Sequence, residues 1–355
     1  MEPSEDTVSF DERGLRLNTA DDSEIICKEL ESKQVKVLIL QGNTFGIEAS
    51  EIIGQELARH PELKEAHFKD MFTSRGREEV PVALGHLLKG INDSGAELTL
   101  LDLSDNAIGP IGAPAVIEFL GSPAAIKIEK LSLNNCGLGP EGSSTIAPYI
   151  SKLTELREFI CGRNRLENHG AKNMSGALSE LNKLEILKMP QNGIHVEGFK
   201  SIINALMANI ETITDVDFSD NTIKSEGAEA LAKAISGSKC LRILRLDDCL
   251  LGNDGFSIIC KALAKSQILG TMKEASFEGN EIEGEEIVDL ITDTFTTCKS
   301  NFILNLLAND FIREELSALE TLSPRFKILV DDPSDCDYTD SEDDYEDDSG
   351  DKGDD

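Results

Sequence analysis

The sequence predicts an α/β solenoid in which one short strand and one helix alternate about ten times. The main observation is a recurring pattern, L-x-x-L-x-L-x-x-N/C-x-L, in which x is any residue. Its Asn or Cys position returns at intervals of 28, 35, 30, 28, 28, 29, 28, 31 and 29 residues, at Asn43, Met71, Asn106, Cys136, Asn164, Asn192, Asn221, Cys249, Asn280 and Asn309. Such a register predicts strands stacked side by side, each followed by a turn and a returning helix.

Two further features support the helical return. The Asn or Cys side chain is expected to point inward and to satisfy backbone groups in the bend between strand and helix. Six residues later, six consecutive repeats carry a glycine that lets the chain enter a closely packed helix, namely Gly112, Gly142, Gly170, Gly198, Gly227 and Gly255. Together they predict a leucine-rich-repeat horseshoe like that of ribonuclease inhibitor, with the strands on its concave face.

The two ends of the chain depart from the pattern. Residues 1–34 hold a strand-like segment at Leu15–Leu17 and a helix-like segment at 25–30, which predicts an N-terminal cap. The repeat domain is expected over residues 35–330. Residues 331–355 contain 14 Asp or Glu and one Lys, with too few apolar residues to offset the entropy of ordering, so we expect a disordered acidic tail.

Charge and cysteine content limit the function classes. The formal net charge of −32 disfavours nucleic acid and anionic membranes as ligands and favours a basic protein partner. No apolar run approaches the roughly 20 residues that span a bilayer, so no membrane insertion is expected. The eight cysteines show no paired spacing and no signal peptide is recognised, which predicts a soluble, reduced and intracellular protein. We expect it to be a monomer.

Motifs for chemistry are lacking. The sequence has no zinc spacing, phosphate-binding loop or nucleophile elbow, so we expect no cofactor, no metal and no active site in this chain. Function is then expected at departures from the repeat pattern.

Three departures fall in the turns after the strands of repeats two to five. In repeat two, Met71 replaces Asn, and the longer interval holds a basic loop with Arg75. In repeat five, Arg163 and Arg165 flank the recurring Asn or Cys position, and in repeat four Asn135 precedes it. Each departure has an alternative interpretation without function. The loop with Arg75 could be a neutral surface insertion, Arg163 and Arg165 could be solvated charges, and Asn135 could be an ordinary turn residue. Because all project from one edge, we expect a single contact surface.

At these residues the sequence resembles the Ran GTPase-activating protein family. The resemblance runs from the N-terminal cap to the acidic tail, and the segment 161–168 is its most specific part. It rests on Phe72-Thr-Ser-Arg75, Leu103-Ser-Asp-Asn-Ala-Ile-Gly-Pro110, Asn135-Cys-Gly-Leu-Gly-Pro140, Cys161-Gly-Arg-Asn-Arg-Leu-Glu-Asn168, Gln191-Asn-Gly-Ile194 and Asp248-Cys-Leu-Leu251.

The resemblance implies a mechanism and residue roles. Members bind Ran in its GTP form, with or without a Ran-binding protein, and order Ran's own catalytic side chains without inserting an arginine finger. By this resemblance Asn135 contacts the switch region beside the nucleotide. Arg75 and Arg165 anchor the complex, and Arg163 belongs to the same block.

Three differences from the family matter. Ser74 replaces a glycine of the loop, which is expected to stiffen it, and Cys136 replaces an Asn seen in some members. The C-terminal domain of animal members is lacking, so the resemblance is to yeast-like members and implies a cytoplasmic, including perinuclear, location. The alternative function is a ribonuclease-inhibitor-like binding protein for a basic partner, although such inhibitors are richer in Cys and contain Trp.

Overall fold

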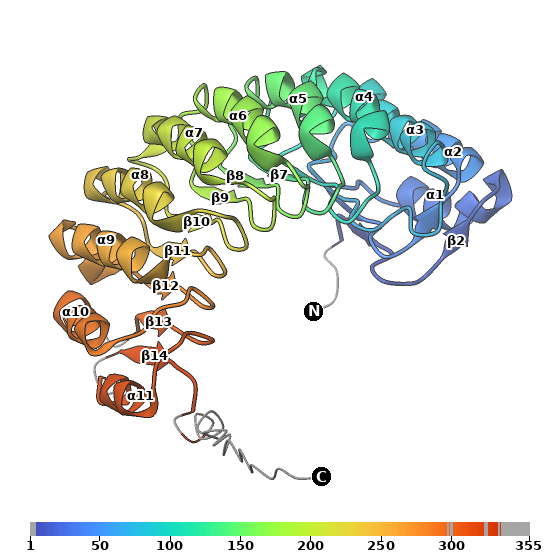
Figure 1. Ribbon diagram of the computed structural model, residues 1–355. Coiled ribbons are helices and arrows are strands. Elements are labelled where there is room, and N and C mark those ends of the chain that lie inside the picture. Colours follow the sequence, from blue (N-terminus) through green and yellow to red (C-terminus); the bar gives the residue numbers. More distant parts are fainter. Residues whose placement is uncertain (1–4, 297, 299–300, 323–325, 333, 335–355) are drawn as a thin grey trace, which may run out of the picture.

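The molecule is a curved solenoid with strands on its inner face and helices on its outer face (Figure 1). The computed structural model describes residues 5–296, 298, 301–322, 326–332 and 334. The strands of the main sheet are β1 (Thr7–Ser9), β3 (Val37–Ile39), β5 (Glu65–His67), β6 (Leu100–Asp102), β7 (Lys130–Ser132), β8 (Glu158–Ile160), β9 (Ile186–Lys188), β10 (Asp215–Asp217), β11 (Ile243–Arg245), β12 (Glu274–Ser276), β13 (Ile303–Asn305) and β14 (Lys327–Leu329).

The helices follow the strands one by one and lie side by side on the convex face. They are α1 (Ala20–Glu31), α2 (Ile47–Leu57), α3 (Glu79–Ser94), α4 (Gly109–Leu120), α5 (Gly139–Ile150), α6 (Glu167–Leu178), α7 (Val196–Leu206), α8 (Lys224–Gly237), α9 (Gly252–Lys265), α10 (Glu285–Phe295) and α11 (Arg313–Glu320), with short 3₁₀ turns at Pro123–Ala125, Met207–Asn209 and Leu269–Thr271. A two-stranded sheet of β2 (Arg16–Leu17) and β4 (Thr44–Phe45) lies beside the first repeats.

The main sheet is parallel and its register follows the sequence pattern. The middle residue of each strand pairs with the middle residue of the next, as Leu101 does with Leu131 and Leu131 with Phe159. These middle residues are buried, whereas their neighbours face the concave side. The core is therefore one continuous aliphatic layer between sheet and helices, as the predicted leucine-rich-repeat fold requires.

A buried ladder of side chains joins each strand-to-helix turn to the preceding repeat. Asn164, which has no exposed surface, donates to the carbonyl oxygens of Leu133 (2.7 Å) and Gly162 (2.9 Å). Its amide oxygen accepts from the backbone N–H of Cys136 (3.0 Å) and of Leu138 (3.3 Å). The predicted inward role of this position is confirmed, and we call it the ladder position.

The periodic glycines lie in the first turns of α4 to α9, where the chain packs closely. At Gly198, for example, an added Cβ would lie 2.7 Å from Asn168 Oδ1 and 3.0 Å from Ile194 Cγ2. A larger residue would push the helix away from the preceding repeat.

The sheet extends further at both ends than the sequence pattern indicated. The predicted cap does contain a strand at β2 and a helix at α1, but β1 also adds Val8 and Phe10 to the core. At the other end β14 pairs with β13 after α11. Apart from residues 331, 332 and 334, the expected acidic tail lies outside the described residues.

Across the described ranges, every helix is too short or too polar to cross a lipid bilayer.

The loop of repeat two breaks the ladder, and Arg75 provides a different link. Met71 is fully buried at the ladder position but has no amide to donate. The guanidinium of Arg75 donates to Thr44 Oγ1 (2.9 Å), to the Thr44 carbonyl oxygen (3.2 Å) and to the Leu17 carbonyl oxygen (3.3 Å). It also pairs with Glu79 (3.3 Å), and only 12% of the side chain is exposed. Arg75 thus fastens this loop to β2 and β4.

We predict that Arg75→Ala lowers the free energy of unfolding by about 2 kcal/mol, because a half-buried carbonyl and the Glu79 carboxylate lose a charged donor. Arg75→Lys should lose less, since one charged donor remains. Urea unfolding followed by circular dichroism measures the difference. Arg77→Ala is the control, because Arg77 lies exposed in the same loop. Equal unfolding energies for the two alanine variants would contradict the role given to Arg75.

Candidate functional site

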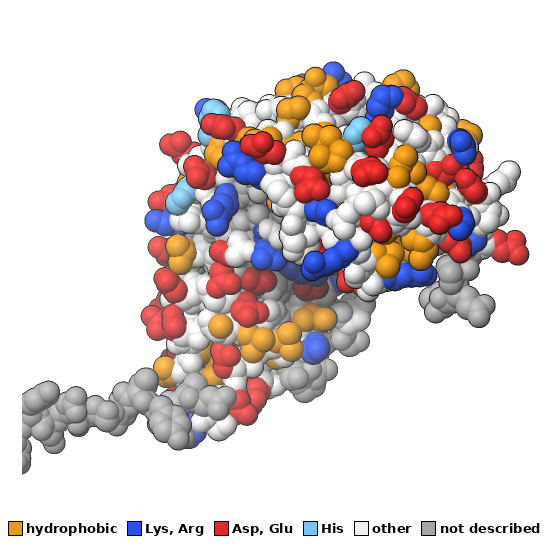
Figure 2. All heavy atoms as spheres, turned by 90° about the vertical axis from the view of Figure 1, so that its right-hand side faces the viewer, with side chains coloured by type: hydrophobic (Ala, Val, Ile, Leu, Met, Phe, Trp, Pro, Cys, Tyr) orange, Lys and Arg blue, Asp and Glu red, His pale blue; other side chains and the backbone are white. Residues whose placement is uncertain are grey.

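The predicted site residues lie in the turns between strands and helices, along one edge of the solenoid. We call this edge of repeats two to five the rim, formed by residues 69–78, 104–108, 134–138 and 162–167. In the view of Figure 2, Lys and Arg side chains gather along the border of the concave hollow, while Asp and Glu are spread over much of the remaining surface. The side chains of the rim are therefore candidates for contact with a partner.

Asn135 is exposed on the rim, directly before the ladder position of repeat four. Its backbone is left-handed, with φ of 53°, a conformation that Asn tolerates better than most residues. The side-chain N–H donates to Asp105 Oδ1 (2.9 Å), and Asp105 pairs with Lys69 Nζ (3.2 Å). The hydrogen bond to Asp105 raises the pKa of Lys69 above its ordinary value. Asn135 is therefore held by a chain of contacts across three repeats.

Arg163 and Arg165 are exposed in repeat five, and both have left-handed backbones, with φ of 56° and 53°. Glu167 follows with φ of 54°. In repeat four the positions that match Arg165 and Glu167 are Gly137 and Gly139. A left-handed residue other than glycine costs about 1 kcal/mol. Repeat five thus keeps strained charged residues where its neighbour uses glycine, which points to a role for those side chains.

The structure brings Asn135 and Arg163 together. Both directly precede the ladder position, in adjacent repeats, and the Asn135 N–H donates to the carbonyl oxygen of Gly162 (2.9 Å). Neither Arg163 nor Arg165 forms an ion pair with a carboxylate in the described part of the chain. Their guanidinium groups are available to an outside partner.

Arg75 does not join them. The sequence predicted that Arg75 shares one contact surface with them, but its side chain turns back onto β2 and β4, where it donates to the carbonyl oxygens of Leu17 and Thr44 and pairs with Glu79. Next to it, Ser74 has φ of 68°, in the region that favours glycine, so a serine here adds strain to this loop. Whether Arg75 also contacts a partner stays a prediction.

Asp105 and Lys69 were missed by the sequence analysis. Asp105 occupies the same position before the ladder residue as Asn135, one repeat earlier, with φ of 58°. That equivalence was visible in the sequence and could have identified it. The contribution of Lys69 depends on side-chain reach across two repeats, which the repeat pattern does not encode.

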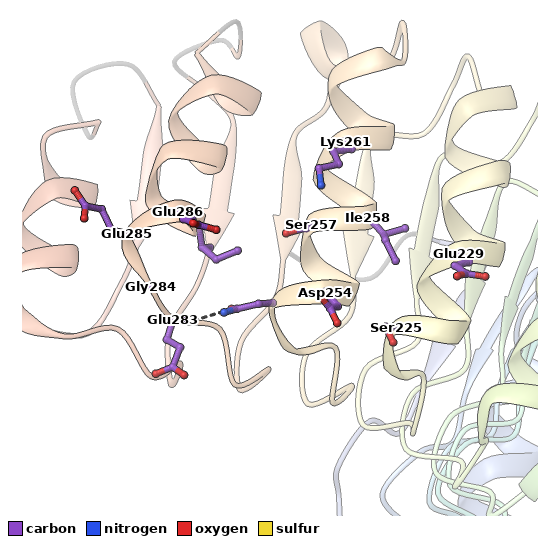
Figure 3. A pocket seen from close by; sticks show the side chains of 12 residues that line it. Ser225, Glu229, Asp254, Ser257, Ile258, Lys261, Glu283, Gly284, Glu285 and Glu286 are labelled. Atoms are coloured by element: carbon purple, nitrogen blue, oxygen red, sulfur yellow. Dashed lines mark hydrogen bonds between the residues drawn. The ribbon is translucent and has the colours of Figure 1, made fainter.

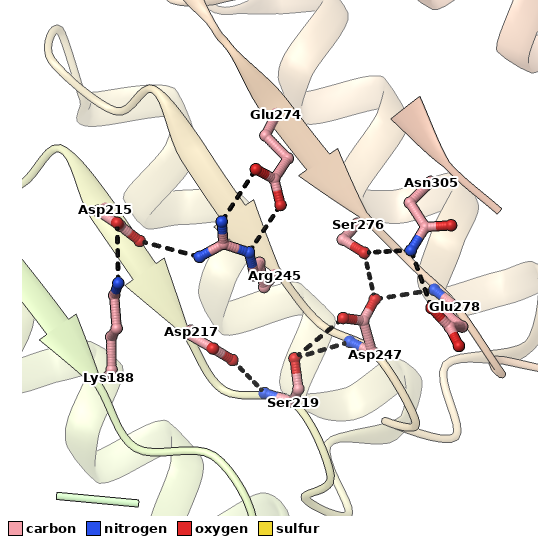
Figure 4. A network of polar contacts seen from close by, with 10 residues as sticks. All are labelled: Lys188, Asp215, Asp217, Ser219, Arg245, Asp247, Glu274, Ser276, Glu278 and Asn305. Carbon is pink, nitrogen blue, oxygen red and sulfur yellow. Dashed lines mark hydrogen bonds and ion pairs between the residues drawn. The ribbon is translucent and has the colours of Figure 1, made fainter. Parts of the chain in front are cut away.

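The charged residues of the concave face mostly satisfy one another (Figure 4). Asp215 lies between Lys188 Nζ (3.4 Å) and Arg245 Nη1 (3.8 Å), and Arg245 donates through Nε and Nη2 to both oxygens of Glu274 (2.6 and 2.9 Å). Burial raises the pKa of Asp215 above its ordinary value, against the opposite effect of Lys188 and Arg245. These arginine and lysine charges are engaged, unlike those of Arg163 and Arg165.

Reactive groups are scarce. Among the described residues, no three His, Cys, Asp or Glu side chains are grouped so that they could hold a metal ion. Burial raises the pKa of Cys161 to about 12 and that of Cys136 well above its ordinary value, so neither thiol is a nucleophile at neutral pH. The rim can bind and orient a partner, and its chemistry is that of hydrogen bonds and charge.

Comparison with known proteins agrees with the fold. A family described as "Leucine Rich repeat" matches residues 98–116 and 209–232. The chain is also 27% identical to mouse ribonuclease inhibitor over 56% of its length and 43% of that protein.

Two other relatives are more similar. The chain is 43% identical to Ran GTPase-activating protein 1 of Xenopus laevis over 53% of its length, but this stretch spans only 34% of the Xenopus protein. It is 32% identical to Ran GTPase-activating protein 1 of Saccharomyces cerevisiae, over 80% of this chain and 72% of the yeast protein. Because identity at this level extends over most of both proteins, this chain belongs to the family of Ran GTPase-activating proteins.

Proposed function

We propose that this chain stimulates GTP hydrolysis by the small GTPase Ran and supplies no active site of its own. The supporting observation is the rim, where Asn135 is held in place beside two strained arginines that form no ion pair with the described residues. The names of the relatives point to the partner. Ran in its GTP form is the proposed ligand, bound by a monomer of this chain, with a Ran-binding protein as an optional further component.

In the proposed mechanism Asn135 orients the switch region of Ran. One N–H of its amide is engaged by Asp105, and the described residues provide no donor to its amide oxygen. The oxygen and the second N–H are thus presented in a fixed direction to a group on the partner. Such positioning contributes to catalysis by reducing the motions that the reacting groups must lose.

The proposal does not need an arginine finger. A finger must extend into the partner's nucleotide site, whereas the guanidinium of Arg75 is committed to Thr44, Leu17 and Glu79. Arg163 and Arg165 are assigned to charged contacts with the surface of Ran, which stabilise the complex.

The location proposed from the resemblance is cytoplasmic, including the perinuclear region. Fluorescence imaging of the tagged full chain tests it, and accumulation inside the nucleus would exclude it.

Release of phosphate from Ran·GTP tests the activity. The chain alone should not hydrolyse GTP, and trace amounts should strongly accelerate hydrolysis by Ran, with and without a Ran-binding protein. A folded protein that leaves the rate of Ran unchanged would refute the proposal. If that protein instead inhibited a pancreatic-type ribonuclease, the alternative function would be favoured.

A second prediction separates the contribution of Arg163 and Arg165 to binding from their effect on the free energy of unfolding. Arg163→Gly and Arg165→Gly should each leave the free energy of unfolding unchanged or raise it by about 1 kcal/mol, because glycine relieves the left-handed strain. Each should nevertheless raise the concentration needed for half-maximal stimulation by about tenfold.

The matched control is Lys224→Gly, which removes an exposed cation at φ of 56° in repeat seven, away from the rim of repeats two to five. It should relieve the same strain and leave stimulation unchanged. If all three variants impaired stimulation equally, general loss of charge would explain the result, and the assignment of Arg163 and Arg165 would fail.

A third prediction concerns the support of Asn135. Asp105→Gly removes the acceptor that fixes the Asn135 amide and adds no strain at φ of 58°. We expect the maximal rate of GTP hydrolysis, at saturating concentrations of this chain, to fall by roughly tenfold. The concentration needed for half-maximal stimulation should change little, because the Asn135 amide loses its fixed orientation but keeps its contact with the partner. Asp220→Gly, at the equivalent position of repeat seven with φ of 55°, is the control. If Asp105→Gly instead raised only the concentration needed for half-maximal stimulation and left the maximal rate unchanged, Asp105 would act in binding.

A further inference from the structure

A groove opens on the convex side between α9 and α10 and reaches α8, with a volume of about 660 Å³ (Figure 3). It begins at the edge where the helices start, beside Asn253 and Glu283, and extends along α9 toward Lys261. Asn253 Oδ1 accepts from the backbone N–H of Glu283 (3.0 Å) and closes this end.

The groove has a cause in the sequence. Six residues after the ladder position, repeats three to eight carry the glycine that lets neighbouring helices pack closely, but after Asn280 this position is Glu286. Moreover, α8 and α9 begin three residues after their ladder positions, whereas α10 begins five residues after Asn280, at Glu285. The residue before it, Gly284, has φ of 97°. A late start and a missing glycine together keep α10 apart from α9 (Figure 1).

The lining combines negative charge with an apolar floor. Five carboxylates and one lysine give it a formal net charge of −4, the carboxylates being those of Glu229, Asp254, Glu283, Glu285 and Glu286. Within the described part of the chain, none of these carboxylates forms an ion pair.

Two isoleucines supply the apolar part of the groove. Ile258 on α9 is half-buried, and Ile287 on α10 is buried with 6% exposure. A ligand that places only charge here would leave this apolar surface without a partner.

We propose that the groove docks a basic, amphipathic segment of a partner protein, with lysine or arginine side chains against the carboxylates and an apolar side chain against Ile258 and Ile287. A groove between two helices suits a helical segment, which presents such side chains at successive turns. A nucleic acid is disfavoured because its phosphates would face five carboxylates. The acidic residues 331–355 are repelled for the same reason. This docking site is independent of the proposed stimulation of Ran.

The test uses the full chain and a fluorescein-labelled helical peptide with lysines on one face and two leucines a turn apart. Fluorescence anisotropy should show binding that weakens with salt. A peptide with serine in place of each leucine should bind about tenfold more weakly, because it loses the contacts with the isoleucines.

The decisive variant is Asp254→Lys with Glu286→Lys, which reverses one charge in the first turn of α9 and one in that of α10. It should weaken peptide binding by about tenfold or more. Its matched control is Asp21→Lys with Glu48→Lys, which reverses one exposed Asp and one exposed Glu in the first turns of α1 and α2 and thus carries the same cost to the helix dipole. The control should change binding less than twofold.

A neutral variant tests the groove without changing its charge or the stability of the fold. Ser257→Tyr places bulk in the groove without altering its charge and should weaken binding as well, with unchanged thermal unfolding. If the double variant in the groove and the control double variant lost the same peptide affinity, the proposal would be overturned, because the overall negative charge of the chain would then explain the binding. Equal binding of the leucine and serine peptides, or of the wild type and Ser257→Tyr, would also overturn it. Stimulation of Ran is expected to be unchanged in these variants, so the two proposals can fail separately.

Discussion

The structure depends on the hydrogen bonds of the buried ladder. Each turn from strand to helix leaves backbone groups that no regular secondary structure can pair, and these groups lie inside the solenoid, away from water. Asn192 shows the solution: it donates to the Cys161 carbonyl oxygen (2.8 Å) and accepts from the Asn164 N–H (2.9 Å). Where the position is Cys136 the thiol still donates to the Leu103 carbonyl oxygen (3.2 Å). The ladder joins neighbouring repeats on the side of the strands, which lie closer together than the helices, and this difference in spacing curves the solenoid.

The ladder also explains why the rim is a good place for function. Residues next to a ladder position are held in a bend whose geometry the buried amide determines, so their side chains emerge in fixed directions. Left-handed backbone is part of that bend. Directly before the ladder residue most repeats place Asp, Asn, Gln or Gly, whereas directly after it Leu250 and Glu281 are also left-handed. Arg163 and Arg165 occupy the same conformation at a cost in stability. At Arg165 the preceding repeat has Gly137 in the same conformation, so the fold does not require the strain there, which indicates a role for the side chain.

Periodic features could be predicted from the sequence, and features that depend on contacts between repeats could not. The ladder, the strand register and the close packing at Gly198 follow from spacing alone. The strand β1 was missed because Arg13 stands where a ladder Asn would be expected, although Val8 and Phe10 fill the core as in any repeat. The contacts of Arg75 could not be predicted for a similar reason: its acceptors at Leu17 and Thr44 are 58 and 31 residues away, and no local pattern encodes them.

Two breaks in the repeat have opposite structural consequences. At Met71 the ladder itself is interrupted, and Arg75 fastens the loop that follows to the carbonyl oxygens of Leu17 and Thr44. At Glu286 the ladder is intact, since Asn280 still accepts from the Cys249 N–H (3.1 Å) and donates to the Leu246 carbonyl oxygen (2.8 Å). Only the helices separate there, and the sheet continues without disturbance through β12 and β13. The break on the convex face therefore leaves the ladder and the sheet unchanged, and the groove beside α10 opens without disturbing the concave face.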